Sequence, residues 1–223
     1  AIPALRDWVR ALSGRDALLG IGIALTAGAG FEFVTVVIGP LLVQYGASDG
    51  QVSTFFGILA PAGLVAGALV SGQVTDRVAP VRGTVAGLLA IALLVGALGT
   101  LLATGNEPRG VPLLAALATV YVAIGFFTAA SYALFMGLAR GNLAATRFAV
   151  FMAMTNACEA ITGFTAGRLQ GEIGYGPTLL LLVGVSLVAL PLLVRLADGR
   201  AGPEDGPLRP PGRRIRGQHH ARE

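Results

Sequence analysis

The chain has 223 residues, of which 54% are hydrophobic and 13% charged, and its mean hydropathy is +0.74. A soluble domain carries about 25% charged residues, so this composition excludes an ordinary soluble domain. The net charge is +4, and every lysine-or-arginine position is an arginine, because the chain contains no lysine. The arginines lie in short gaps between apolar runs and in a C-terminal tail, which indicates membrane topology and no nucleic-acid partner.

The chain begins with a short amphipathic segment, residues 1–16. Leu5, Trp8 and Val9 fall on one helical face and Arg6 and Arg10 on the other, a pattern typical of a helix lying at the membrane surface. Six apolar runs follow within residues 17–197, and a spanning helix needs roughly 20 apolar residues. The predicted spans are 17–45, 52–75, 81–103, 111–139, 146–170 and 177–197. Residues 198–223 are rich in Gly, Pro and Arg and predict a disordered tail.

The arginines predict the orientation of these spans. Fourteen of them precede the first span, follow the sixth, or lie in the linkers between spans two and three and between spans four and five. The opposite side has only Arg109 and, near the end of span five, Arg168. The positive-inside rule therefore predicts that both termini are cytoplasmic, as an even number of spans requires. We expect a multi-pass protein of the cell (inner or plasma) membrane.

Small residues recur at four-residue spacing in two of the spans. Span two has Gly63, Gly67 and Ser71, and span three begins with Gly83 and Gly87. Such spacing allows helix backbones to approach closely in a membrane. The sequence therefore predicts tight helix packing here.

Three polar stripes run along the predicted spans. Glu32 shares a helical face with Gly28, Thr35 and Gly39. Glu159 shares a helical face with Thr155 and Thr162, and with Asn156 one turn back. The third stripe consists of Tyr121, Gly125, Thr128 and Tyr132 in span four. An ionisable residue within a span should face the bundle interior or a water-filled cavity. Glu32, Asn156, Glu159, Tyr121 and Thr128 are therefore candidates for solute contact or proton coupling. The alternative is a structural glutamate paired with an arginine or a backbone donor.

The linker between spans two and three, GQVTDRVAPVR at 72–82, resembles the loop motif of the major facilitator superfamily, Gly-x-x-x-Asp-Arg-x-Gly-x-(Arg/Lys). Here Ala79-Pro80 replaces the inner glycine of that motif. We expect Gly72 to allow close helix contact, and Asp76, Arg77 and Arg82 to form a gate at the cytoplasmic mouth.

Two further stretches are similar to one branch of that superfamily. The stretch PALRDWVR at 3–10 resembles the linker entering the second half of AmpG-type muropeptide permeases and their siderophore and acetyl-CoA relatives. The stretch ATRFAVFMAMTN at 145–156 resembles the eleventh helix of the same branch. The resemblance covers about residues 3–197. It implies an all-α membrane fold equivalent to the C-terminal six-helix half of a twelve-helix transporter.

The predicted function is secondary active transport of a small solute by alternating access, with proton coupling as a further expectation. The predicted partners are the lipid bilayer, the solute and a second six-helix half, which is either the same chain type or a missing N-terminal half. The alternative is a non-transporting assembly or scaffold subunit of the same fold. An enzyme is not expected, because no nucleophile–base pair is visible and His219 and His220 lie in the tail without further ligands. No cofactor or metal is predicted.

Overall fold

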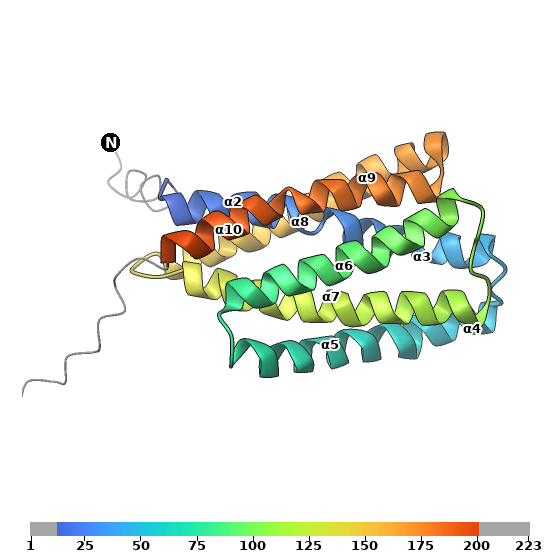
Figure 1. The fold of residues 1–223 in the computed structure, drawn as a ribbon, viewed down its shortest axis with the longest axis horizontal. Coiled ribbons are helices and arrows are strands. Elements are labelled where there is room, and N and C mark those ends of the chain that lie inside the picture. The colour runs from blue at the N-terminus through green and yellow to red at the C-terminus, as the bar shows by residue number, and fades with distance from the viewer. Residues whose placement is uncertain (1–12, 201–223) are drawn as a thin grey trace, which may run out of the picture.

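A computed structural model describes residues 13–200. Most of the predicted interfacial segment (1–16) and nearly all of the predicted tail (198–223), including His219 and His220, lie outside the described residues. The described part consists of helices joined by short turns (Figure 1). In chain order the helices are α2 (Arg15–Thr26), α3 (Ala29–Gln44), α4 (Asp49–Thr54), the π-helical turn η1 (Phe55–Leu59), α5 (Ala60–Thr75), α6 (Pro80–Ala103), α7 (Val111–Leu138), α8 (Ala144–Ile173), α9 (Tyr175–Leu187) and α10 (Ala189–Arg200).

Within the described residues, five helical stretches are long and apolar enough to cross a membrane. They are Arg15–Gln44, Asp49–Thr75, Pro80–Ala103, Val111–Leu138 and Tyr175–Gly199. The all-helical membrane character predicted from the sequence is thus confirmed. The remaining predicted span corresponds to α8, which has 30 residues and is long enough, but it is not among the five. Its centre is more polar, because it includes Thr155, Asn156, Glu159 and Thr162.

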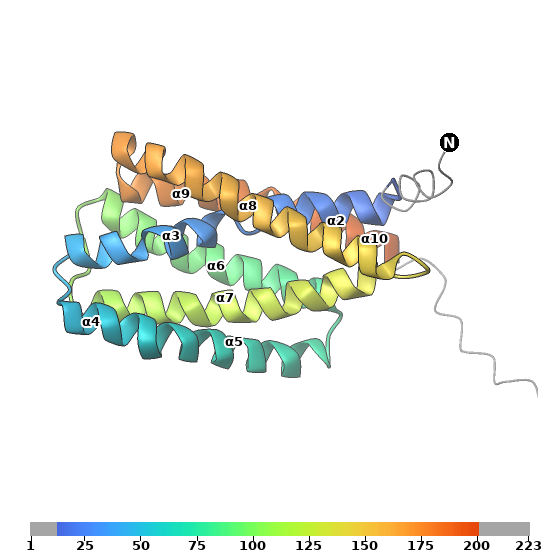
Figure 2. The ribbon, with the colours of Figure 1, turned by 180° about the vertical axis from the view of Figure 1, so that it is seen from behind.

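The long helices lie side by side and alternate in direction (Figures 1 and 2). The α5–α6 turn, the α7–α8 turn, the start of α2 and the end of α10 lie at one end of the bundle. The other three connections, α3–α4, α6–α7 and α8–α9, lie at the opposite end. The arginine-rich linkers are therefore gathered at one end, and Arg109 lies at the other, where it pairs with Glu107 at 3.1 Å.

Proline accounts for irregularities in two of the spans. Pro191 has no N–H to donate to the Leu187 carbonyl, and the helix is interrupted there between α9 and α10. Pro61 likewise has no N–H for the Gly57 carbonyl, which lies inside η1. Such π-turns and kinks occur where the regular hydrogen-bond ladder is broken.

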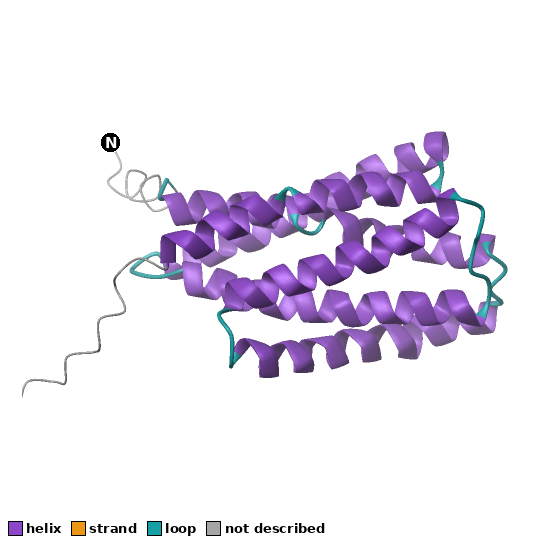
Figure 3. Ribbon diagram, in the orientation of Figure 1, coloured by secondary structure: helices purple, strands orange, loops and turns teal. Residues whose placement is uncertain are grey.

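The first span is also interrupted, between α2 and α3 at residues 27–28. The N–H of Gly30 does not continue the helical ladder but donates to the Oγ of Ser186 in α9 at 2.7 Å. A Cβ atom at position 30 would lie 3.1 Å from that same Oγ and 3.3 Å from the Cα of Val183, so the glycine allows this close approach. The interruptions of the first and last spans are teal segments partway along the bundle in Figure 3. The hydrogen bond joins the two broken spans.

The predicted close packing of small residues is confirmed. Gly63 and Gly67 are buried against α7, and a Cβ at Gly67 would overlap the backbone of Val122 and Phe126. On α7 the corresponding small residue is Gly125, which lies against the backbone of Leu64. This contact holds α5 at the edge of the bundle, where its main neighbour is α7.

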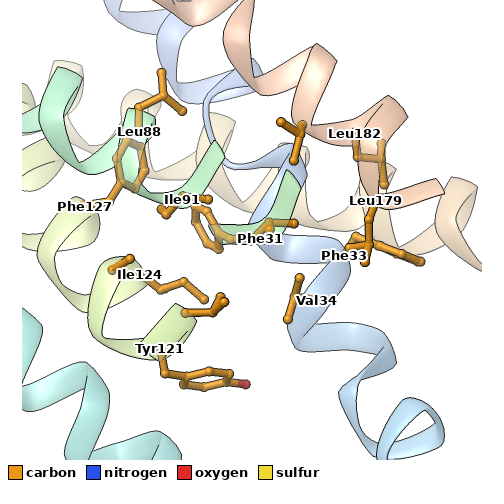
Figure 4. Close-up of a cluster of buried hydrophobic side chains, with 14 of the residues drawn as sticks. Phe31, Phe33, Val34, Leu88, Ile91, Tyr121, Ile124, Phe127, Leu179 and Leu182 are labelled. Carbon is orange, nitrogen blue, oxygen red and sulfur yellow. The ribbon is translucent and has the colours of Figure 1, made fainter. Parts of the chain in front are cut away.

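A continuous apolar core connects α3, α6, α7 and α9 (Figure 4). The rings of Phe31 and Phe127 meet edge to face, with centroids 5.6 Å apart, and Leu88 and Ile91 of α6 lie beside them. Edge-to-face aromatic pairs add about 0.5–1.5 kcal/mol beyond the burial of their area. This core fixes α3 and α7 relative to each other and so sets the width of the space between them.

Contacts between helices follow a paired pattern. Helix α5 packs on α7, and α8 packs on α2 and α3. Helix α6 also packs on α7, and α9 and α10 pack on α3 and α2. Helices α6 and α9 pack on each other. Helix α7 and the pair α2–α3 are thus each covered by two further helices or helix pairs.

Candidate functional site

A cavity of about 120 Å³ lies between the first span, α7 and α8. Its polar lining includes Glu32 from α3, Thr128 and Tyr132 from α7, and Asn156 and Glu159 from α8. Glu32 and Glu159 each lie near the middle of a helical stretch of 30 residues. The cavity is therefore at mid-depth in the bundle, where a membrane-spanning protein has few polar side chains.

Four of the five predicted solute or coupling residues meet in this cavity. Glu32, Thr128, Asn156 and Glu159 come from three spans that are far apart in the sequence. The fifth, Tyr121, does not line the cavity: its ring is 7% exposed and packs edge to face on Phe55, with centroids 5.4 Å apart. Because an α-helix rises 1.5 Å per residue, Tyr121 lies about 16 Å along α7 from Tyr132, which does line the cavity.

The interruption between α2 and α3 positions Glu32. It places the carboxylate in the first turn of α3, where the partial positive charge of a helix N-terminus stabilises an anion. Gly28 lies against this side chain, and a Cβ there would make ordinary van der Waals contact with the Cγ of Glu32 at 3.4 Å and with the Sγ of Cys158 at 3.5 Å. The Oγ1 of Thr35 donates to the backbone carbonyl of Glu32 at 2.8 Å.

The register of α8 positions Asn156 and Glu159. One side of the helix is buried and carries Phe151, Cys158, Thr162 and Ala166. Asn156 and Glu159 lie beside that buried side and line the cavity. Both residues are exposed at the surface of this bundle. Among residues 13–200, neither side chain has a hydrogen-bond partner in the protein. They are available to a solute or to water.

Aromatic rings also line the cavity. Phe31 and Phe127 approach from α3 and α7, and Phe135 stacks on Phe151 with centroids 5.2 Å apart. Tyr132 is 41% exposed and lies at the rim. Sequence reasoning did not identify the three phenylalanines, because in the sequence they look like any other apolar residue of a span. The site thus combines carboxylate and amide oxygens with apolar ring faces, which is the composition of a small-molecule site.

The predicted gate residues all lie at the arginine-rich end, in or beside the α5–α6 turn. Asp76 ends α5 with its N–H bonded to the carbonyl of Gly72 at 3.0 Å, and Arg82 lies in the first turn of α6. All four motif residues, including Arg77, are exposed, and none of the charged ones forms an ion pair within the described bundle. The close helix contact predicted at Gly72 is wrong: a Cβ there would meet nothing within 4 Å, because the tight contacts lie further along at Gly67 and Gly83.

The described residues contain no group of three or more His, Cys, Asp or Glu side chains that could hold a metal ion. No protein-family model matches the chain, and no curated protein sequence matches it at a significant level.

Proposed function

We propose that this chain is one half of a secondary transporter that moves a small solute across the membrane by alternating access. The observation that carries the proposal is the mid-depth cavity with Glu32, Asn156 and Glu159 in its wall. Ionisable residues within membrane spans are costly, about 2.5–3.5 kcal/mol on insertion scales, and mark solute or ion pathways. A purely structural bundle gains nothing from two carboxylates at this depth.

The paired contacts between spans support the same proposal. Secondary transporters are built from repeats of opposite topology, with the solute site near the membrane midplane between them. The contacts fit two units of three spans with opposite direction, in which the first and fourth spans would be equivalent, and residues from both line the cavity. The resemblance of residues 72–82 to the major facilitator loop motif is consistent with this arrangement.

The proposed partner is a second six-helix half that covers the cavity. Asn156, Glu159 and Tyr132 are exposed on the open face of this bundle, and contact with lipid there would be unfavourable. In the assembled transporter the unpaired charges of Asp76, Arg77 and Arg82 would meet charges of the second half. We place the arginine-rich end in the cytoplasm of a cell membrane.

Uptake into proteoliposomes tests the proposal. The chain in its native assembly should accelerate uptake of at least one solute from a broad radiolabelled panel, relative to protein-free vesicles. Glu159→Gln should lower that uptake at least tenfold. Glu172→Gln, at the exposed end of the same helix, is the matched control and should leave it unchanged. Uptake that is insensitive to Glu159→Gln would instead support the scaffold role.

Proton coupling is a second part of the proposal. Carboxyl groups within the membrane relay protons in pumps and transporters, and Glu32 and Glu159 are the two acidic residues that line the cavity. An imposed pH gradient should therefore drive uptake above the level reached without a gradient. Equal uptake under both conditions would exclude coupling while leaving the transport proposal in place.

A further inference from the structure

The charge of the cavity wall is one-sided. Two carboxylates, those of Glu32 and Glu159, line it. No arginine is among the described residues that line the cavity, and the chain has no lysine. Carboxylates within the membrane-spanning part of a protein are costly, and a positive charge placed near them stabilises them.

The neighbouring arginines of α8 are engaged elsewhere. The Arg147 guanidinium donates to the carbonyl of Arg140 at 3.1 Å, at the arginine-rich end of the bundle. The Arg168 guanidinium lies over the ring of Phe164, 4.5 Å from its centroid, and Phe164 is 64% exposed on the outer surface. Neither side chain lines the cavity. Within the described bundle, no basic side chain offsets the two carboxylates, and a cationic ligand would do so.

The aromatic wall selects among cations. Phe31, Phe127, Phe135 and Tyr132 face the same space as the two carboxylates. Ring faces attract organic ammonium groups by about 0.5–2 kcal/mol, and they also provide apolar surface for the rest of the molecule. A hydrated inorganic cation would instead need a shell of oxygen ligands and would gain nothing from the four rings, although Thr128, Ser131, Thr155 and Asn156 also line the cavity.

The size of the cavity sets an upper limit on the part of the ligand it holds. A cavity of about 150 Å³ holds a benzene-sized molecule, so the volume of about 120 Å³ here encloses less than a whole ring with its ammonium group. The cavity is open on the face where Tyr132 and Glu159 are exposed, and the rest of a larger ligand would extend outward there. We therefore propose that this cavity binds a small organic cation, an ammonium group attached to one aromatic ring or a similar apolar group. The ammonium lies between Glu32 and Glu159, and the apolar group lies against the phenylalanines. This inference rests on the proposed function, because it names the solute class of the same cavity.

Binding to the full chain in lipid nanodiscs tests this inference without a gradient or transport. The probe is radiolabelled phenyltrimethylammonium, with empty nanodiscs to measure partition into lipid. The uncharged isostere tert-butylbenzene and the anion phenylacetate serve as competitors. We expect saturable binding of the cation, and competition at least tenfold weaker by the isostere and the anion than by unlabelled cation. No binding above empty nanodiscs, or equal competition by the isostere, would overturn the proposal.

Substitutions locate the binding. Glu159→Gln should weaken cation binding at least tenfold, Glu159→Asp should retain more of it, and the control Glu172→Gln should change it less than twofold. Tyr132→Leu should weaken it about two- to fivefold, the fold-change that corresponds to an exposed cation–π contact. Thermal unfolding of each variant separates loss of the site from loss of the fold. Unchanged affinity in folded Glu159→Gln would refute the proposed site.

The outcomes also separate this inference from the proposed function. If the cation binds but exchange of labelled for unlabelled cation across proteoliposomes is not accelerated, the binding site stands and the transport proposal fails. If a neutral or anionic solute is transported and the cation does not bind, transport stands and the cation proposal fails.

Discussion

The hydrogen bond from the Gly30 N–H to the Ser186 Oγ joins the interrupted first and last spans, and Ser186→Ala removes its acceptor. Both residues are buried, and the bond length is 2.7 Å. The helix interruption leaves the Gly30 N–H no carbonyl of the preceding turn, so the substitution leaves a buried donor unsatisfied. Such a group costs about 1–3 kcal/mol, whereas interhelical hydrogen bonds measured in membranes average about 0.6 kcal/mol with a maximum near 1.7. We expect a loss of about 1–2 kcal/mol.

Ser131→Ala is the matched control for this substitution. Ser131 is also a buried serine within a span, but its Oγ donates to the carbonyl of Thr128 in its own helix at 2.9 Å. Removing it leaves a carbonyl that still accepts a backbone bond, so we expect a loss of less than about 0.5 kcal/mol. Equilibrium unfolding by SDS in mixed micelles, followed by circular dichroism, measures both free energies. Equal losses in the two variants would refute the idea that Ser186 satisfies the interrupted backbone.

Two further predictions concern packing and access. Gly67→Ala should destabilise the bundle by about 1–3 kcal/mol in the same assay, because the added methyl group would overlap α7. The control Gly72→Ala should be neutral or stabilising by up to about 1 kcal/mol. Similar losses of stability at both positions would contradict the tight contact at Gly67. In a Cys158→Ser background, Asn156→Cys should react with a membrane-impermeant maleimide in the assembled protein, and Leu93→Cys, which is 72% exposed on the apolar surface, should not. Labelling of neither cysteine would show that water does not reach the cavity.

The sequence predicts those structural features that depend only on the spacing of residues along the chain or on the apolar environment of the bilayer. Apolar runs identify the five helices that are long and apolar enough to cross a membrane, and the four-residue spacing of Gly63 and Gly67 identifies the helix face that meets α7. The placement of Glu32 and Glu159 in one cavity also follows from a simple rule, namely that charges within spans are turned away from lipid. These features need only local pattern and the chemistry of the solvent.

Other features depend on contacts between distant segments and could not be predicted in this way. The run 17–45 looks continuous, but the backbone is interrupted where Gly30 meets Ser186, a residue 156 positions later. Tyr121 and Tyr132 share a helical face, yet only Tyr132 reaches the cavity, because the polar stripe extends along α7 beyond the site. The contact expected at Gly72 fails for a similar reason: a glycine permits close approach, but a neighbouring helix must be present to make it.

The paired contacts between helices have a thermodynamic consequence for the proposed transporter. If α5 and α8 exchanged the ways in which they pack on α7 and on α2 and α3, contacts of the same kind would be made again. The two arrangements would then bury similar surfaces, and their free energies would differ by little. A ligand would need only a small difference in affinity between them to move the population, since each 1.4 kcal/mol changes the ratio tenfold. Near-equality of the two states would thus follow from the paired contacts, independent of the chemistry of any one residue in the cavity.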